Sequence, residues 1–377
     1  MKLSDLATPA AVIDEARMMA NIARMQTQMN LLGVRFRPHV KTSKCIDVVQ
    51  RQRAAGASGI TVSTLKEAQQ FFAAGFNDIL YAVCMAPNKL AQALELRRRG
   101  CQLTVLVDSL ASAHAVVAYG QAEQHSFEVM IEIDCDGHRS GVQPEAPELL
   151  LIGQILHQGS AKLKGVLTHA GSSYDLNKPE ALRQMAEQER RLCVRAAQRL
   201  REANLPCAEV SVGSTPTALS ATTLEGVTEV RAGVYVFFDL VMANIGVCST
   251  QELALSVLTT VIGHKPDKGW ALVDAGWMAM SRDRGTQKQA HDYGYGAVCD
   301  QDAGLLNGFV LTGANQEHGI VALADGSVAS HIDELFPIGT RLRILPNHAC
   351  ATAAQFPQYQ VLDAQGQVSS WERFYGW

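Results

Sequence analysis

The first two-thirds of the chain repeats one pattern, in which a short run of β-branched and apolar residues precedes a longer amphipathic stretch. This alternation is typical of parallel strands joined by helices that pack on the sheet. Eight separated strands favour a (β/α)8 TIM-like barrel, with an open doubly wound sheet as the alternative. No GxGxxG motif follows the first strand, which disfavours a dinucleotide-binding form of that alternative. The expected barrel strands are Val34–Arg37, Gly59–Ser63, Asp78–Val83, Gln102–Asp108, Phe127–Asp134, Leu163–His169, Glu209–Gly213 and Val227–Arg231.

The pattern changes after about Phe238, where short strand-like runs are separated by turn residues and little helix is predicted. We therefore expect a second, mostly-β domain. Its expected strands are Leu253–Gly263, Gly269–Asp274, Gly308–Thr312, Gly319–Leu323, Arg341–Leu345 and Tyr359–Leu362. Within the first part, three helices have clear end signals. They are Glu67–Ala74 before Gly75, Leu90–Arg99 before Gly100, and a long helix from near Asn177 to before Pro206.

Composition excludes several classes of protein. The 377 residues are 47% hydrophobic with a net charge of −4, and no basic block interleaved with aromatic residues suggests nucleic acid. No apolar stretch reaches the roughly 18 residues of a membrane span, and Asp5 precedes any apolar region of a signal peptide. The nine cysteines form no CxxC pair, which is typical of reduced thiols. We expect a cytoplasmic protein without nucleic-acid or membrane partners.

Polar, cationic and glycine-rich residues follow the carboxyl ends of the predicted strands. In barrels of this kind the loops at that end build the active site. The clustering therefore predicts a site there, provided that the barrel is correct. The loops are Arg37–Lys44, Asp134–Arg139, His169–Tyr174, Gly213–Thr217 and Arg231–Tyr235.

Two of these loops suggest a chemistry, and each has an ordinary interpretation beside it. Lys41 follows a buried strand, and a lysine in a pocket of low dielectric constant can form a Schiff base; most loop lysines are simply solvated, as we expect for Lys44. His39 shares the face of Lys41 if the chain is extended, or it is a satisfied buried group. Backbone N–H groups and hydroxyls at Gly213–Thr215, together with Gly233, suit a phosphate cradle or an ordinary turn.

A third feature lies in the second domain, where His348 and Cys350 are separated by one residue. Both side chains point the same way if the segment is extended, and an imidazole with a thiolate suits Zn²⁺. Two protein ligands would leave positions open for water or substrate, as in a catalytic site. The alternative is a core cysteine beside a capped histidine.

Together these segments resemble the D-threonine aldolase and D-serine dehydratase family of fold-type III pyridoxal-phosphate enzymes, which are related to alanine racemase. The resemblance runs from Asp5 to Trp377. The matching segments are Arg37–Lys44, Thr168–Tyr174, Gly213–Thr217, Arg231–Asp239, Gln316–Gly319 and His348–Cys350. It implies an alanine-racemase-like fold with a barrel over residues 10–240 and a β domain formed by residues 1–9 together with 241–377. It also implies a homodimer with a site between the domains.

The resemblance also implies roles for individual residues. Lys41 would carry pyridoxal 5′-phosphate as a Schiff base and act as the catalytic base, and His169 and Tyr174 would line the ring and the substrate. His348 and Cys350 would bind Zn²⁺, or Mn²⁺ or another divalent metal instead. The expected cofactor-binding residues are His39, Arg139, Tyr174, Gly213, Ser214, Thr215, Arg231, Gly233 and Tyr235, with Arg139 and Arg231 as cations near the ring.

The activity implied is that of a dehydratase, which converts a D-3-hydroxy amino acid such as D-serine or D-threo-3-hydroxyaspartate to a 2-oxo acid and ammonia. Aldolases of the family tend to have aspartate where Cys350 stands, so the cysteine favours the dehydratase branch. Retro-aldol cleavage to glycine and an aldehyde is the alternative. A racemase would leave the metal pair unexplained, and a non-catalytic cofactor carrier would lack the second domain. The loop 281–288 contains two arginines that either bind a second substrate carboxylate or face water.

Overall fold

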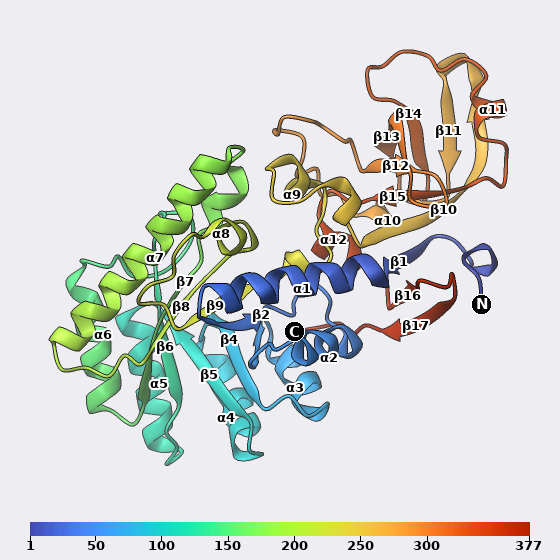
Figure 1. The fold of residues 1–377 in the computed structure, drawn as a ribbon. Coiled ribbons are helices and arrows are strands. Elements are labelled where there is room, and N and C mark those ends of the chain that lie inside the picture. Colours follow the sequence, from blue (N-terminus) through green and yellow to red (C-terminus); the bar gives the residue numbers. More distant parts are fainter. The chain divides into compact units, whose positions relative to one another are not determined.

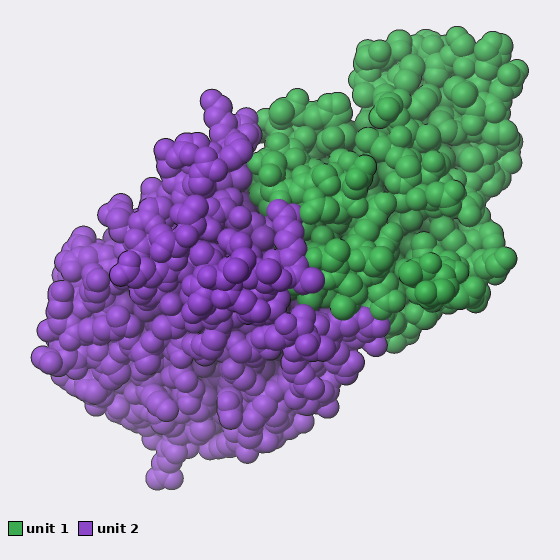
Figure 2. Space-filling model, in the orientation of Figure 1, with its two compact units in different colours: residues 1–22, 234–373 green, residues 23–233, 374–377 purple.

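The computed structural model describes residues 1–377, and it divides them into two compact units (Figure 2). We call Ala23–Gly233 with Phe374–Trp377 the barrel unit, and Met1–Ile22 with Val234–Arg373 the β unit. The nine cysteines form no disulfide. None of the helices combines the length and the apolar character that a membrane crossing needs.

The barrel unit contains eight parallel strands in the order β2-β9-β8-β7-β6-β5-β4-β3 (Figure 1). An isolated parallel bridge between His39 and Thr61 links the two edge strands, so the sheet is nearly closed. Its strands are β2 (Arg35–Pro38), β3 (Ile60–Val62), β4 (Asp78–Cys84), β5 (Gln102–Val107), β6 (Glu128–Ile133), β7 (Lys162–Thr168), β8 (Glu209–Val212) and β9 (Glu229–Ala232).

Helices cover the outside of these strands (Figure 1), so residues such as Leu103–Val107 of β5 are buried on both faces and form a continuous buried run that is apolar except at Thr104. The barrel interior is filled by side chains from four neighbouring strands, namely Leu80, Leu106, Met130 and Leu167. The helices of this part are α2 (Ile46–Ala54), α3 (Leu65–Ala73), α4 (Leu90–Arg98), α5 (Leu110–Ala122), α6 (Pro147–Gln158), α7 (Pro179–Glu202) and α8 (Thr215–Ser220), together with the second half of α1 (Glu15–Leu31), which begins in the β unit.

The β unit is built on a nine-stranded sheet in the order β11-β14-β13-β12-β15-β10-β1-β16-β17. Strand β11 also pairs with β10, so six of the strands close on themselves and β1, β16 and β17 extend from β10. The strands are β1 (Ala10–Asp14), β10 (Leu255–Lys265), β11 (Trp270–Val273), β12 (Ala297–Cys299), β13 (Leu305–Ala314), β14 (Gly319–Leu323), β15 (Arg341–Leu345), β16 (Gln358–Leu362) and β17 (Val368–Glu372).

Only short helices interrupt this sheet: α9 (Leu240–Asn244), α10 (Trp277–Met280), α11 (Ile332–Leu335) and α12 (Ala349–Ala353). Short 3-10 turns complete the chain at Leu3–Asp5, Pro87–Lys89, Gly171–Asp175, Val234–Val236, Thr250–Glu252 and Pro266–Lys268.

The predicted fold class, a parallel barrel followed by a mostly-β domain, is confirmed. Details differ. Helix α7 begins at Pro179 with Lys178 as its N-cap and without a capping side chain, so Asn177, near which we expected the helix to begin and which we expected to cap it, is not its N-cap. Strand β1 and helix α1 were not predicted from the sequence. The β1 segment has only five residues, and its pairing partners Leu255–Leu258 lie far along the chain.

Candidate active site

Titratable side chains collect at the carboxyl ends of the barrel strands, as predicted. His39 follows β2, Lys41 lies in the turn beyond it, and His169 follows β7. The charges of Lys41 and of Arg231, from β9, each lower the pKa values of both His39 and His169, so these groups lie close together. The structure therefore brings four of the predicted site residues into one place.

Lys41 differs in one respect from the expectation. Its side chain is exposed, because the residue lies in a turn beyond the end of β2 and not in the strand itself. Lys44 is not the solvated lysine that we expected. It is half-buried, and its Nζ lies 3.2 Å from Oε1 of the fully buried Glu67. This ion pair fixes the end of the turn that carries Lys41.

His169 is held in one orientation and one protonation state. Its Nδ1 lies 2.9 Å from the carbonyl oxygen of Gly213, and since a carbonyl can only accept, Nδ1 carries the proton. Burial is the main reason that the pKa of His169 falls to about 4; the bond to Gly213 opposes the fall, and the charge of Lys41 adds to it. The ring is therefore neutral at pH 7, with an unprotonated Nε2. Tyr174 lies beside it, at 6.1 Å between ring centroids.

His39 is also neutral, because burial and the charges of Lys41 and Arg231 hold its pKa well below the usual value. Its Nδ1 is buried and has no hydrogen-bond partner. Buried polar atoms are nearly always paired, so this orphaned nitrogen is unusual. A bound group with a donor or acceptor near Nδ1 would satisfy it.

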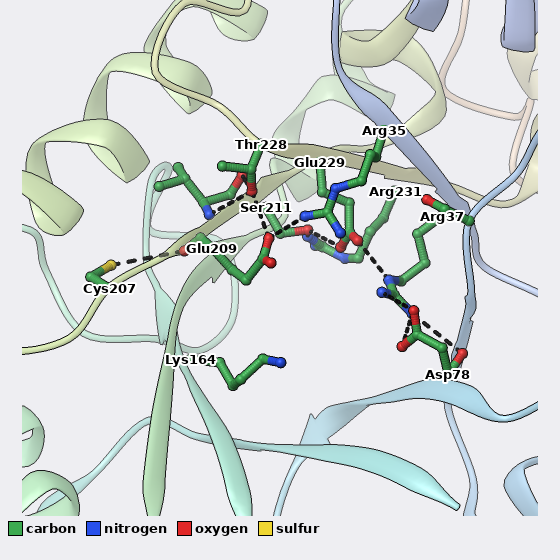
Figure 3. A network of polar contacts seen from close by, with 12 residues as sticks. Arg35, Arg37, Asp78, Lys164, Cys207, Glu209, Ser211, Thr228, Glu229 and Arg231 are labelled. Atoms are coloured by element: carbon green, nitrogen blue, oxygen red, sulfur yellow. Dashed lines mark hydrogen bonds and ion pairs between the residues drawn. The ribbon is translucent and has the colours of Figure 1, made fainter.

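Arg231 is fixed by a chain of polar contacts that runs through the barrel (Figure 3). Its Nη1 donates to Ser211 Oγ at 2.7 Å and its Nη2 to the Thr168 carbonyl at 2.6 Å. A guanidinium can only donate, so the Ser211 hydroxyl must give its own proton to Glu229, at 2.8 Å. The other oxygen of Glu229 accepts from Arg37 Nε at 2.7 Å. Arg231 is thus a buried, immobile cation.

The predicted phosphate cradle is only partly as expected. The N–H of Gly213 donates to Glu189 Oε1 at 3.1 Å, and that of Ser214 to Thr217 Oγ1 at 3.0 Å, so neither is available without rearrangement. Gly213 has a φ of +138°, and an added Cβ would lie 2.0 Å from the Arg231 carbonyl oxygen. The glycine is therefore required by the close packing of β8 on β9.

The remaining members of the cradle lie nearby in the chain. Ser214 caps α8 and its Oγ lies 2.9 Å from Ser173 Oγ, while Thr215 begins the helix. At Gly233 an added Cβ would lie 2.9 Å from the His39 carbonyl oxygen, so this loop packs against the β2 end. Tyr235 follows two residues later, in the β unit, and its side chain is buried.

Arg139, the other expected cation, is largely exposed, with 59% of its side chain accessible. Its Nη2 lies 3.4 Å from Oε1 of Glu132, which is 6% exposed. Glu132 is one of three potential metal ligands that the sequence did not single out; it forms a group with Cys84 and Asp108, whose ligand atoms lie within 4.8 Å of one another. Burial and the neighbouring Glu132 raise the pKa of Cys84, and its thiol donates to Glu132 at 3.2 Å. This group is a hydrogen-bonded thiol between carboxylates.

Glu189 is another residue that sequence reasoning missed. It lies on α7, is 1% exposed, and accepts the N–H groups of both Ala170 and Gly213. The only signal was an acidic residue on the apolar face of the predicted helix. Its effect is to join the loops after β7 and β8.

The second predicted centre lies in the β unit. His348 is the N-cap of α12 and Cys350 lies in its first turn. The His348 Nδ1 lies 2.7 Å from Asp283 Oδ2, and its ring also contacts the Cys350 thiol. Burial opposes the charge of His348, but Cys350 and Asp283 together raise the pKa of the imidazole to about 11. Since Nδ1 is bonded to Asp283, Nε2 is the nitrogen left to bind a metal.

The two arginines of the loop 281–288 already have partners. Arg284 pairs with Asp292 at 2.9 Å, and Arg282 lies over the ring of Trp277 at 4.3 Å. Binding of a second substrate carboxylate by this loop stays a prediction. A cavity of about 180 Å³ is lined in part by Arg53, Phe76 and Asp78, near the amino ends of β3 and β4.

Comparison with known proteins identifies both parts of the chain. Residues 13–241 match the alanine racemase N-terminal domain, and residues 254–362 match a putative serine dehydratase domain. The chain is 67% identical to the D-threo-3-hydroxyaspartate dehydratase of Delftia sp. over 100% of this chain and 99% of that protein. It is 30% identical to the D-serine dehydratase of Dictyostelium discoideum (97% and 96% covered) and to the D-threonine aldolase of an Arthrobacter species (93% and 87% covered).

The crystal structure of the Delftia dehydratase superimposes with a TM-score of 0.99, covering 100% of both chains. Two variants of that protein give the same TM-score. In one, a cysteine is replaced by alanine and the protein is in a metal-free form; in the other, a histidine is replaced by alanine.

Proposed function

Because the chain belongs to the family of D-serine dehydratases and D-threonine aldolases, with a barrel of the alanine racemase type, we propose that it is a pyridoxal-phosphate- and zinc-dependent dehydratase. The enzyme would convert a D-3-hydroxy amino acid, D-threo-3-hydroxyaspartate or D-serine, to a 2-oxo acid and ammonia. The observation that carries this proposal is the 67% identity to a dehydratase over the whole chain. The family resemblance predicted from the sequence is thereby confirmed.

The barrel residues fit pyridoxal phosphate. The orphaned Nδ1 of His39 is suited to a polar contact with a group held beside Lys41, and hydroxyls of Ser214 and Thr215 lie at the beginning of α8. Lys41 would hold the cofactor through Nζ. When bound, pyridoxal phosphate supplies an electron sink for negative charge at the α-carbon of an amino acid. We propose Gly213, Ser214, Thr215, Gly233 and Tyr235 as the phosphate site, and Arg139 and Arg231 as the cations near the ring.

The residues at the strand ends would then have separate roles in the reaction. The Nζ of Lys41 would take the proton from the substrate α-carbon as the general base. His169 would present a neutral ring whose orientation is set by its bond to Gly213, and Tyr174 would pack beside it. Arg231 would offer a cation that cannot move, since Ser211 and Thr168 hold both of its terminal nitrogens.

The donor set at His348 and Cys350 fits a zinc site. A metal-ligating histidine usually donates its other N–H to a carboxylate, as His348 does to Asp283. In the related dehydratase the substituted histidine and cysteine are also separated by one residue, and the solved structure of the cysteine variant is of a metal-free form. Zinc bound there would supply a Lewis acid for the departing 3-hydroxyl.

The functional division that we propose is a cofactor-binding barrel over residues 10–240 and a metal-binding β domain of residues 1–9 and 241–377. The family models match 13–241 and 254–362, close to this division, although residues 10–22, with strand β1, and 234–240 belong to the compact β unit. We also propose a cytoplasmic homodimer that acts on a small-molecule D-amino acid. The absence of any disulfide among the nine cysteines is compatible with a reducing compartment.

The test is an assay of 2-oxo acid and ammonia with D-serine, D-threonine and D-threo-3-hydroxyaspartate, with and without a chelator, while glycine is measured in parallel. We expect chelator-sensitive 2-oxo acid without glycine. Glycine and an aldehyde would assign the chain to the aldolase branch. Full turnover in the chelated enzyme would contradict the role of the metal.

A further inference from the structure

The loop 281–288 carries Asp283, whose contact with His348 supports the proposed zinc site and whose own role is still to be assigned. Asp283 Oδ2 lies 2.7 Å from His348 Nδ1, while Oδ1 accepts the N–H of Gly285 at 2.8 Å. The Asp283 N–H contacts Ser281 Oγ at 3.2 Å. Each carboxylate oxygen therefore has its own partner, and the carboxylate cannot rotate without breaking one of these bonds.

The loop itself is attached to the segment that carries His348. Asn347, which is 2% exposed, donates to the carbonyl oxygens of Asp283 at 3.1 Å and Gly294 at 2.8 Å. The Asn347 amide oxygen accepts from Thr286 Oγ1 at 3.1 Å. The residue directly before His348 thus binds the loop at Asp283 and Thr286 and the following segment at Gly294, so the fold sets the distance between Asp283 and His348.

The first turn of α12, which carries Cys350, is fixed independently. The buried carboxylate of Asp239 accepts the N–H of Ala349 at 2.9 Å, and Thr352 Oγ1 donates to the Met280 carbonyl at 2.8 Å. The backbone between His348 and Cys350 therefore has little freedom. What remains to be set is the rotation of the imidazole ring about its side-chain bonds, and the short bond from Nδ1 to Asp283 sets it.

We propose that Asp283 is a positioning residue for the metal: it orients the His348 ring, fixes the tautomer with the proton on Nδ1, and so directs the Nε2 lone pair to the ion. The inference rests on the proposed metal role of His348 and Cys350. It gives the loop 281–288 a task in the metal site, separate from any binding of substrate carboxylate by its arginines.

The expected effect is on metal affinity. Loss of a carboxylate that orients a metal-ligating histidine weakens binding about ten- to a hundred-fold. We would measure the Zn²⁺ dissociation constant of the cofactor-loaded enzyme by competition with a chromophoric chelator. The variants are Asp283→Asn, which keeps the size of the side chain, and Asp283→Ser, which cannot reach Nδ1. Asp292→Asn is the control for the loss of a nearby charge, because Asp292 follows the loop in the chain and pairs with Arg284 and with the N–H of Gly294.

A second readout separates positioning from catalysis. Turnover is followed as a function of free Zn²⁺, and we expect half-saturation of both Asp283 variants at about ten- to a hundred-fold higher concentration, with a plateau near that of the unaltered enzyme. Circular dichroism of each variant verifies folding. If Asp283→Asn does not fold, the Zn²⁺ affinity of Asp283→Ser tests the inference.

The outcomes are distinct. Weaker binding with a retained plateau, and an unchanged Asp292→Asn, supports the inference. Unchanged affinity overturns it, as does a lowered plateau at unchanged affinity, which would place Asp283 in the reaction itself. Complete loss of binding at saturating Zn²⁺ also overturns it, since Asp283 would then be a ligand. If the unaltered enzyme binds no Zn²⁺, the metal part of the proposed function fails first.

Discussion

The buried carboxylate of Glu189 holds Gly213 in place by accepting its backbone N–H at 3.1 Å. The same oxygen accepts the N–H of Ala170 at 2.9 Å, so one side chain on α7 joins the loops that follow β7 and β8. These loops carry His169 and Ser214. A residue on the outer layer of the barrel thereby sets the spacing of two proposed site loops.

The first prediction concerns this link. Glu189→Ala leaves two buried N–H groups without a partner, and each costs about 1–3 kcal/mol. We expect a loss of about 2–6 kcal/mol in the free energy of unfolding, measured by urea denaturation. Glu189→Gln, which keeps an acceptor oxygen, should lose less. Glu187→Ala on the exposed face of the same helix serves as the control and should change stability by less than about 0.5 kcal/mol; equal losses in both alanine variants would contradict the prediction.

A second prediction concerns the chain of polar contacts that links Arg231 through Ser211 and Glu229 to Arg37 (Figure 3). Glu229 is 4% exposed and neutralises Arg37, so Glu229→Gln leaves a buried guanidinium with reduced compensation. Arg37 keeps its ion pair with Asp78 at 2.9 Å, so the expected cost is that of one charge-assisted hydrogen bond, about 1.5–3 kcal/mol. Denaturant unfolding should show this loss. Glu209→Gln is the control: it removes a partner of the exposed Arg35, and the pair is worth at most about 1 kcal/mol. A Glu229→Gln enzyme as stable as the control would refute the prediction.

A third prediction uses the pKa of His169. In the folded chain it is about 4, below the ordinary value of 6.5, so between these values the unfolded chain binds more protons. The stability that depends on the neutral ring is present above about pH 6.5 and is lost as the pH falls toward 4. The maximum loss is about 3 kcal/mol. His169→Gln should flatten the pH dependence of unfolding over this range, and an unchanged slope would mean that His169 protonates freely in the folded state.

The fourth prediction separates the two lysines of the loop after β2. Lys41→Ala should abolish the visible absorption of bound pyridoxal phosphate and leave thermal stability nearly unchanged, because Lys41 is exposed. Lys44→Ala should lower stability and leave the absorption band unchanged. It removes the ion pair with the buried Glu67, lowering stability by about 1–3 kcal/mol, and keeps the absorption band. Retention of the band in Lys41→Ala would exclude Lys41 as the attachment point.

The sequence predicted the barrel because its strands are buried on both faces, and the short apolar run of β5, which ends well before the length of a helix, is typical of a parallel strand. It also placed His39, Lys41 and His169 at one end, since parallel strands end at a common edge. Contacts between segments that are distant in the chain could not be predicted from the sequence. Asp283 and His348 are 65 positions apart, and nothing in the residue types of either segment specifies the pairing. Glu189 was visible only as an acidic residue on the apolar face of a helix, and its partners are backbone groups, which no residue type identifies.

Among the sequence features that suggested a binding site, the glycine-rich loops were the least reliable. Gly213 is required by the approach of β9, and its N–H is already taken by Glu189, so the residue has a structural reason to be glycine whatever the loop binds. Hydrogen-bond acceptors for backbone groups are supplied by tertiary structure, and a local pattern cannot show whether an N–H is available.

The position of β1 in the sheet has a consequence for how the protein is made. This strand pairs with β10 on one side and with β16 on the other, and both are synthesised after the entire barrel. At ribosomal speeds, β1 waits on the order of tens of seconds for its first partner. Meanwhile the barrel strands emerge in order and can assemble. During translation the chain therefore exposes Ala10–Asp14 as an unpaired, largely apolar edge, and this segment, rather than any part of the barrel, is where chaperone binding to the nascent chain should begin.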